Sequence, residues 1–125
     1  MRRVLVVDDV AVNAKLVSAL LRANAFAVDV AFTGEEALAR IAAGSFDLVL
    51  LDLRLPGIDG IAVARALRAD PAHAHLAIVA VTANAMKSDE QAALAAGCDA
   101  FVSKPINTRT FVPLVAELIA RKGGA

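Results

Sequence analysis

Short apolar runs recur five times along the chain, and a longer segment with helical spacing follows each of them. The runs predict strands at residues 3–8, 27–31, 47–51, 77–82 and 100–103. Most of these runs lack the alternation of apolar and polar residues, which is typical of strands buried on both faces of a parallel sheet. The pattern therefore predicts five parallel strands that alternate with five helices.

Apolar residues three and four positions apart mark the helices between the strands. The first helix is expected to face the core through Leu16, Leu20 and Leu21. The clearest stripe belongs to the fifth helix and consists of Phe111, Leu114, Val115, Leu118 and Ile119. The fourth helix, around residues 92–96, offers one leucine among alanines, so we expect it to be the most loosely held.

Capping signals agree with two of these helices. Thr33 with Glu36 predicts a capping box at the start of the second helix, and Ser88 with Gln91 predicts one at the start of the fourth. Such pairs satisfy backbone N–H groups that the first turn of a helix leaves without partners. Both helices are therefore expected to begin directly after the capping residue.

Pro113 complicates the fifth helix. Asn107 is a suitable cap for this helix, and Pro113 then falls six residues further on. Proline at such a position removes a backbone hydrogen bond and crowds the preceding turn. The helix is expected either to begin late, near Thr110, or to be kinked at the proline.

Strands and helices that alternate through short loops predict a doubly wound α/β sandwich, with helices on both faces of a parallel sheet. In such sheets, ligands bind beyond the carboxyl ends of the strands, at a topological switch point. The functional site is therefore expected at that edge.

Composition narrows the classes of function. The 125 residues fit one domain, and 58% of them are hydrophobic, which is enough for a full core. Thirteen basic and 13 acidic residues cancel, so bulk charge gives no support for binding to nucleic acid or to a membrane. The apolar runs fall short of the roughly 18 residues of a membrane span, and no signal peptide is recognisable, so a cytoplasmic location is expected. The single cysteine, Cys98, allows no intrachain disulfide, and we interpret it as a small buried residue rather than a redox sensor.

Polar residues with chemical potential follow the apolar runs. Asp8 and Asp9 follow the first strand and Asp52 the third, while Thr82 ends the fourth and Lys104 follows the fifth. Because the carboxyl ends of parallel strands meet at one edge, these side chains are expected to form one cluster. A cluster of carboxylates is costly unless a cation neutralises it, and a hard metal ion or a lysine is suited to that.

Two kinds of chemistry fit this cluster. Asp9 and Asp52 can bind Mg²⁺ through carboxylate oxygens, with Asp8 acting directly or through water and the backbone carbonyl of Arg54 as a further ligand. A carboxylate can also be a nucleophile that forms an aspartyl phosphate, while a metal shields the charge. The lysine and the threonine of the cluster would then contact phosphoryl oxygens.

Four motifs together resemble the receiver domain of two-component response regulators, including chemotaxis regulators and single-domain cell-division regulators. They are Val6-Val7-Asp8-Asp9, Leu51-Asp52 followed by Leu55-Pro56-Gly57-Ile58-Asp59-Gly60, Val81-Thr82-Ala83, and Phe101-Val102-Ser103-Lys104-Pro105. The resemblance covers nearly the whole chain, with the motifs in the order and spacing of the family. It implies a flavodoxin-like sheet with the strand order 2-1-3-4-5.

The resemblance also implies roles for the residues of the cluster. Asp52 resembles the phosphoacceptor of the family, and Asp8 and Asp9 resemble its Mg²⁺-binding acidic pair. Lys104 resembles the lysine that contacts the phosphoryl group, with a cis peptide bond to Pro105. A sensor histidine kinase or a histidine phosphotransferase would donate the phosphoryl group.

Further positions match those that transmit or time the signal in the family. Thr82 and Phe101 resemble the switch pair, which would remodel the face formed by the fourth helix, the fifth strand and the fifth helix. A downstream protein would then bind that face. Arg54 and Asn84 match positions that tune the phosphoryl lifetime in the family. One hypothesis is that the Arg54 guanidinium lies over the phosphoryl group, and the alternative is an ordinary solvated arginine in a loop.

Three other interpretations compete with this one. An aspartate-nucleophile phosphohydrolase would carry a second aspartate two residues after its nucleophile, where this chain has Arg54. A flavin carrier of similar fold would need a neutral phosphate-binding loop after the first strand, where this chain has Asp8 and Asp9. A degenerate receiver that works without phosphorylation would lack key residues, whereas each key residue type is present here.

The expected domain organisation is simple. Residues 1–122 are predicted to form the receiver domain and residues 123–125 a flexible tail. Because the first strand starts close to Met1 and the fifth helix ends close to the last residue, we favour a stand-alone regulator or phosphorelay shuttle, monomeric or weakly dimeric. A receiver excised from a hybrid histidine kinase or a larger regulator is the alternative. In either case we expect a signalling phosphoacceptor rather than an enzyme, although it can assist its own phosphorylation and dephosphorylation.

Overall fold

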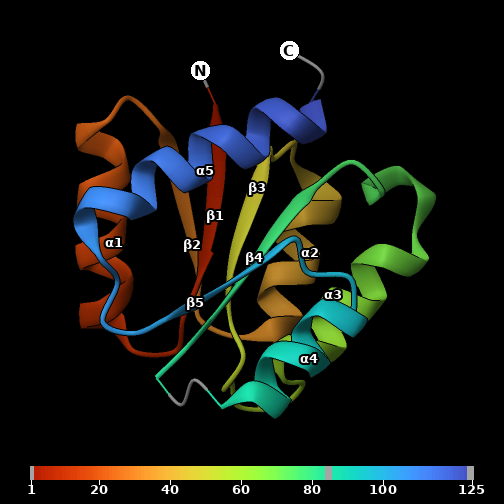
Figure 1. The fold of residues 1–125 in the computed structure, drawn as a ribbon. Coiled ribbons are helices and arrows are strands. Elements are labelled where there is room, and N and C mark those ends of the chain that lie inside the picture. Colours follow the sequence, from red (N-terminus) through yellow and green to blue (C-terminus); the bar gives the residue numbers. More distant parts are fainter. Residues whose placement is uncertain (1, 84–85, 124–125) are drawn as a thin grey trace.

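The computed structural model describes residues 2–83 and 86–123 of the chain. Five parallel strands form one sheet in the order β2-β1-β3-β4-β5, with helices on both faces (Figure 1). The strands are β1 (Arg3–Val7), β2 (Ala27–Ala31), β3 (Leu48–Asp52), β4 (Ala77–Thr82) and β5 (Ala100–Ser103). The helices are α1 (Ala11–Ala23), α2 (Gly34–Ala43), α3 (Gly60–Ala69), α4 (Lys87–Ala95) and α5 (Thr108–Gly123), with a 3-10 turn η1 (Pro71–His73) before β4. The predicted doubly wound α/β fold and its strand order are confirmed.

Two apolar layers hold the helices against the sheet. On one face, α1 and α5 pack against alternate residues of the central strands, for example Leu21 and Phe111 against Val6 and Leu50. On the other face, α2, α3 and α4 pack against the remaining strand residues. Every residue of β3 and β4 is buried, which is why their sequences show no alternation of apolar and polar residues. Among the described residues, no helix combines the length and apolar character that crossing a membrane requires.

The two predicted capping boxes have different outcomes. The Thr33 side chain accepts a hydrogen bond from the Glu36 amide at 3.0 Å, so α2 begins as predicted. The Glu36 carboxylate in turn accepts a hydrogen bond from the Phe32 amide at 2.8 Å. The Ser88 prediction is wrong, because α4 already begins at Lys87 and its capping residue, Met86, makes no side-chain cap bond. The amino end of α4 is therefore held less firmly than that of α2.

Two helices differ from their predicted form in detail. In α1, Leu21 is buried as predicted, but Leu16 is 65% exposed and points away from the core. The helix α5 begins at Thr108, directly after Asn107, so Pro113 lies inside it and the late start near Thr110 is not adopted. Asn107 accepts a hydrogen bond from the Arg109 amide at 2.9 Å, which supports this early start. The last residue of α5 is Gly123, one residue into the predicted tail, while residues 124 and 125 lie outside the described ones.

Candidate functional site

The carboxyl ends of four strands bring the predicted cluster together at the lower edge of the sheet in Figure 1. Val7 pairs with Leu51, so Asp8, the next residue of the chain, lies beside Asp52 at the end of β3. Thr82 pairs with Ser103, which places Lys104 at the same edge. The order of strands in the sheet thus puts β3 and its aspartate between β1 and β4.

Lys104 forms the centre of this cluster. Its ammonium Nζ lies 2.8 Å from Asp52 Oδ2 and 3.1 Å from Asp8 Oδ2. The side chains of Asp8 and Asp52 are only 9% and 8% exposed, so both ion pairs are shielded from water. Burial alone would lower the pKa of Lys104, but the hydrogen bonds and charges of Asp52 and Asp8 outweigh it and raise that pKa above 10.5. The lysine is therefore held in its charged form.

The other oxygen of each buried carboxylate is fixed by the chain that follows it. Asp8 Oδ1 accepts a hydrogen bond from the Val10 amide, and Asp52 Oδ1 accepts one from the Arg54 amide, both at 2.9 Å. Each aspartate thus bonds to the backbone two residues further on, as short polar side chains do in turns. This arrangement fixes the orientation of both carboxylates without any ligand.

A third carboxylate completes a group that fits a metal ion. One carboxylate oxygen from each of Asp8, Asp9 and Asp52 lies within 4.8 Å of the others, and Asp9 is exposed to solvent. Three carboxylates face one ammonium group here, so the cluster keeps an excess of negative charge that a cation can neutralise. Oxygen ligands of this kind suit Mg²⁺, which binds one or two carboxylates and keeps several waters. The acidic cluster can therefore bind a divalent metal ion.

The loop after β3 packs closely on the backbone of Asp52. A side chain at Gly60 would place its Cβ 2.5 Å from the carbonyl oxygen of Asp52 and 2.7 Å from the Cα atom of Leu53. Glycine is thus required for this close approach. The preceding residue, Asp59, caps α3 by accepting a hydrogen bond from the Ala62 amide at 2.9 Å. This part of the sequence motif therefore has a structural role, which is to seat α3 directly against the site.

The predicted switch residues lie on adjacent strands. Thr82 is 1% exposed, and its carbonyl oxygen accepts a hydrogen bond from the Lys104 amide at 2.8 Å. Phe101 pairs with Ala80 and is half-buried against the core of the α2, α3 and α4 face. Thr82 therefore lies at the site, and Phe101 lies on the adjacent strand two positions before its last residue.

The remaining predicted positions are placed as follows. Arg54 is exposed and lines a polar hollow of about 660 Å³ together with Asp9, Thr82 and Asp89. The peptide bond between Lys104 and Pro105 is cis, the isomer that the resemblance implied. Asn84, the second position predicted to tune lifetime, lies outside the described residues.

A groove that was not predicted leads to the buried carboxylates. It has a volume of about 570 Å³ and lies between α1 and the segment that links β5 to α5. Asp8, Asp52 and Lys104 line it together with mainly apolar residues, among them Leu16, which is 65% exposed. The sequence does not predict this groove, because the spacing of Leu16 in α1 is that of a core residue, whereas its side chain is exposed.

Cys98 lies away from this edge, in the short segment between α4 and β5, two residues before the strand. It is 6% exposed, and burial raises the pKa of its thiol to about 11, with the nearby charges of Arg68 and Asp99 acting in opposite directions. A thiol with such a pKa carries little thiolate at neutral pH and reacts slowly. This supports the interpretation of Cys98 as a small buried residue.

Comparison with known proteins gives a consistent result. The family model of the response regulator receiver domain matches residues 4–116 of the chain. The response regulator PleD of Caulobacter vibrioides is 40% identical over 105 residues, which are 84% of this chain and 23% of PleD. The polar-differentiation response regulator DivK of Brucella ovis is 35% identical over 118 residues, which are 94% of this chain and 96% of DivK. The chain thus spans less than a quarter of the length of PleD and nearly all of DivK.

Solved structures agree with these relatives. The receiver domain of a sensor histidine kinase of Pseudomonas aeruginosa, determined with a magnesium ion in its active site cleft, superposes with a TM-score of 0.88. It is 29% identical in sequence, and the match covers 95% of this chain and 98% of that domain.

Proposed function

Because the chain belongs to the response regulator receiver family, we propose that it accepts a phosphoryl group on Asp52 from a phosphohistidine of a partner protein. The observation that carries this proposal is the position of Asp52. It is a buried carboxylate that is hydrogen-bonded to Lys104, flanked by a second buried aspartate, and open to a groove. Such an arrangement prepares one carboxylate oxygen to act as a nucleophile.

Asp52 is a better acceptor than either of the other two aspartates. It lies on β3, between β1 with its acidic pair and β4 with Thr82. A phosphoryl group on Asp52 would therefore have a cation site on one side and the Thr82 hydroxyl with the Lys104 ammonium on the other. Asp9 is exposed, and Asp8 has the edge strand β2 on its other side, so neither is flanked in this way.

The transfer itself exchanges one bond for another. An oxygen of the Asp52 carboxylate forms a bond to phosphorus while the phosphorus–nitrogen bond of the donor phosphohistidine breaks, and the imidazole keeps the electron pair. The Lys104 ammonium, already held at the site, would provide a positive charge to a phosphoryl oxygen, and the Thr82 hydroxyl a hydrogen bond to another. The protein therefore mainly positions and neutralises charge, as a signalling phosphoacceptor rather than as an enzyme that turns over a substrate.

We further propose that Asp8, Asp9 and Asp52 hold Mg²⁺ through their carboxylates, with the backbone carbonyl of Arg54 as an additional ligand. The geometry of the three carboxylates and the magnesium ion in the related Pseudomonas domain support this assignment. When bound, Mg²⁺ would reduce the repulsion between the attacking carboxylate and the phosphoryl oxygens.

The partner that donates the phosphoryl group is proposed to approach along the groove beside α1. Asp52 lines this groove, and the exposed apolar side chains of Val12 and Leu16 extend from it onto the surface of α1. Apolar groups beside a reactive group favour a protein donor over a small one, because they can be buried in the complex. Hybrid histidine kinases of Dictyostelium discoideum are among the relatives, which supports a histidine kinase or a histidine phosphotransferase as the donor class.

The response is proposed to pass through Thr82 and Phe101 to the face formed by α4, β5 and α5, where a downstream protein would bind. Ala93 is the only buried residue of α4, so this helix can shift at little cost in packing. We take residues 1–122 as the unit that carries this function. The match to nearly all of DivK supports a single-domain regulator, while the partial match to PleD leaves a larger regulator as the alternative.

Intact mass spectrometry tests the proposed function. After incubation with acetyl phosphate and Mg²⁺, the protein should gain the mass of one phosphoryl group. The gain should vanish in Asp52→Asn and after removal of Mg²⁺ with EDTA, but persist in Asp59→Asn, whose carboxylate only caps α3. A gain that persists in Asp52→Asn would contradict the assignment of the acceptor.

A further inference from the structure

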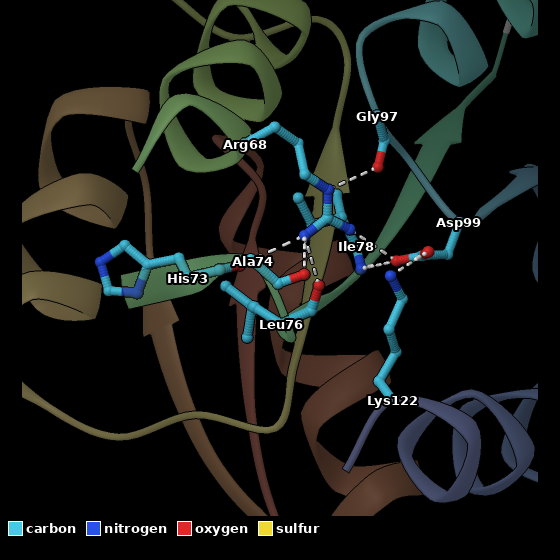
Figure 2. Close-up of polar contacts among 8 residues, drawn as sticks. All are labelled: Arg68, His73, Ala74, Leu76, Ile78, Gly97, Asp99 and Lys122. Carbon is cyan, nitrogen blue, oxygen red and sulfur yellow. Dashed lines mark hydrogen bonds and ion pairs between the residues drawn. The ribbon is translucent and has the colours of Figure 1, made fainter. Parts of the chain in front are cut away.

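A second cluster of charges lies at the opposite edge of the sheet, and the proposed function does not use it. Arg68, next to the carboxyl end of α3, lies with Asp99, which precedes β5, and Lys122, in the last turn of α5 (Figure 2). The side chains of Arg68 and Asp99 are only 19% and 17% exposed. A partly buried ion pair loses hydration, and good geometry and further hydrogen bonds are needed to compensate for this loss.

The Arg68 guanidinium uses each of its nitrogens. Its Nε donates a hydrogen bond to the carbonyl of Gly97 and its Nη1 one to the carbonyl of Leu76, both at 2.8 Å. Longer bonds from Nη1 reach the carbonyls of His73 and Ala74, at 3.3 and 3.4 Å. One side chain thus ties α3 to the segment before β4 and to the turn between α4 and β5.

Asp99 extends these connections to the sheet and to α5. Its Oδ2 accepts hydrogen bonds from Arg68 Nη2 at 2.8 Å and from the Ile78 amide at 2.9 Å, and its Oδ1 pairs with Lys122 Nζ at 3.0 Å. Its own amide donates a hydrogen bond to the carbonyl of Ile78 at 2.7 Å. Asp99 is therefore fixed at both its backbone and its side chain.

The carboxyl end of α4 is built around the same arginine. Gly97 has a φ of +104°, and a side chain there would place its Cβ 2.4 Å from Arg68 Cγ. The amides of Gly97 and Cys98 return to the carbonyls of Leu94 and Ala93, the pair of bonds that closes a helix with a glycine in the left-handed region. The end of the helix and the arginine thus fit each other only because residue 97 has no side chain.

Among residues 2–83 and 86–123, none anchors the amino end of α4 in this way. Its capping residue, Met86, is 57% exposed and makes no side-chain cap bond, and the buried residue Ala93 lies in the second half of the helix. We propose that Arg68 and Asp99 form a fixed pivot for the carboxyl end of α4, which confines movement of this helix to its amino-terminal half, beside Thr82. The strand β5 and the last turn of α5 keep their places while α4 moves.

Amide hydrogen exchange of the whole chain, read by mass spectrometry at single-residue resolution, tests the pivot without any phosphorylation. In the unmodified protein, the amides of Cys98 and Asp99 should exchange at least about tenfold more slowly than those of Asp89 and Glu90 in the first turn of α4. Equal protection at the two ends of α4 would overturn the proposal.

Substitution of the arginine then tests which group holds the end in place. Arg68→Gln should accelerate exchange at Cys98 and Asp99 by about tenfold or more, which corresponds to the loss of a charge-assisted hydrogen bond, and leave Asp89 unchanged. The control is Arg65→Gln, an exposed arginine of the same helix that makes no hydrogen bond or ion pair with any described residue. If Arg68→Gln does not fold, Asp99→Asn supplies the same comparison, because its amide oxygen can still accept from Ile78. Unchanged protection at residue 98 in the folded variant would contradict the pivot.

A second arm adds beryllofluoride and Mg²⁺, and this arm rests on the proposed function. The change in exchange should fall on Asp89 and Glu90 and spare Cys98 and Asp99. No change anywhere would count against the proposed function, while the result without beryllofluoride would still decide the pivot. A change at the carboxyl end as large as that at the amino end would overturn the pivot and leave the phosphoacceptor role intact.

Discussion

At the carboxyl edge of the sheet, one lysine lies between two buried carboxylates with a third nearby, whereas at the amino edge one partly buried carboxylate lies between an arginine and a lysine. The amino edge is saturated, because the remaining donors of Arg68 end on backbone carbonyls. The carboxyl edge keeps an excess of negative charge and an open groove. The comparison shows that similar ion pairs have different roles at the two edges of the sheet. The amino-edge cluster, whose guanidinium and carboxylate are both hydrogen-bonded to the backbone and to each other, holds elements of the fold together. The carboxyl-edge cluster keeps an excess of negative charge that suits a cation, which the proposed function requires.

Removal of the arginine should have the largest effect on stability. Arg68→Ala leaves Asp99 partly buried with Lys122 as its remaining cation, and several carbonyls lose their donor. The free energy of unfolding should therefore fall by about 3 kcal/mol, the lower end of the cost of breaking a buried pair. Urea unfolding measures this, and Arg65→Ala, on the exposed side of the same helix, should change it by less than about 0.5 kcal/mol. A similar small loss in both variants would show that the amino edge does not hold the fold.

Magnesium should stabilise the carboxyl edge alone. At ten times its Kd, Mg²⁺ should add about 1.4 kcal/mol to the free energy of unfolding, because it binds the folded cluster and not the unfolded chain. In Asp9→Asn the gain should shrink or disappear, while Arg68→Ala should keep it if the variant folds. Thermal unfolding in a calcium-free buffer, with and without Mg²⁺, measures this gain in stability. An equal gain in Asp9→Asn would show that the ion binds elsewhere.

The sequence predicted one of these edges and not the other. The carboxyl edge could be predicted because Asp8, Asp52 and Lys104 each follow an apolar run. Parallel strands bring such positions together independently of the conformation of the loops. Arg68 reads as an ordinary cation at a helix end, and its partners lie 29 and 31 residues further on. A glycine that ends a helix is a pattern of the sequence, but the close packing of Arg68 against position 97 depends on the tertiary structure.

Two smaller failures have a similar cause. Leu16 has the spacing of a core residue, but which side of α1 faces the core depends on where α5 lies, and the spacing within one helix does not contain that information. Ser88 has the pattern of a capping residue, but α4 begins at Lys87, two residues earlier than that pattern requires. In both cases the helix itself was predicted correctly, whereas the residue that faces the core or the residue that caps the helix was not.

A smaller effect on the free energy of unfolding should appear at high pH, where Lys104 loses its proton. Because Asp52 and Asp8 raise the pKa of folded Lys104, this lysine contributes stability that is complete below about 10.5 and is lost as the pH rises through the higher folded value. The pKa of Cys98 is also raised, so the stability of the protein falls as the pH rises above about 9 for this reason too. A variant at Lys104 is therefore needed to separate the two contributions. As the pH rises above about 10.5, Lys104→Met should show a shallower loss of stability than the parent in urea unfolding, whereas the loss due to Cys98 is common to both proteins. Identical slopes would contradict the raised pKa.

The smallest predicted effect concerns Arg54. An exposed charge near the site contributes about 0.2–1 kcal/mol, so Arg54→Ala should change the rate of dephosphorylation by about 1.4- to fivefold. Loss of the phosphoryl mass over time measures the rate, with Arg65→Ala as the control. An unchanged rate would place the Arg54 side chain in solvent, away from the phosphoryl group.

The most direct test locates the phosphoryl group on the chain. After incubation with acetyl phosphate and Mg²⁺, borohydride reduction converts an aspartyl phosphate to homoserine, and peptide sequencing by mass spectrometry then identifies the position. The account predicts homoserine at position 52 and unchanged aspartate at positions 8 and 9. Homoserine at position 8 or 9, with aspartate intact at position 52, would contradict the assignment of Asp52 as the phosphoacceptor.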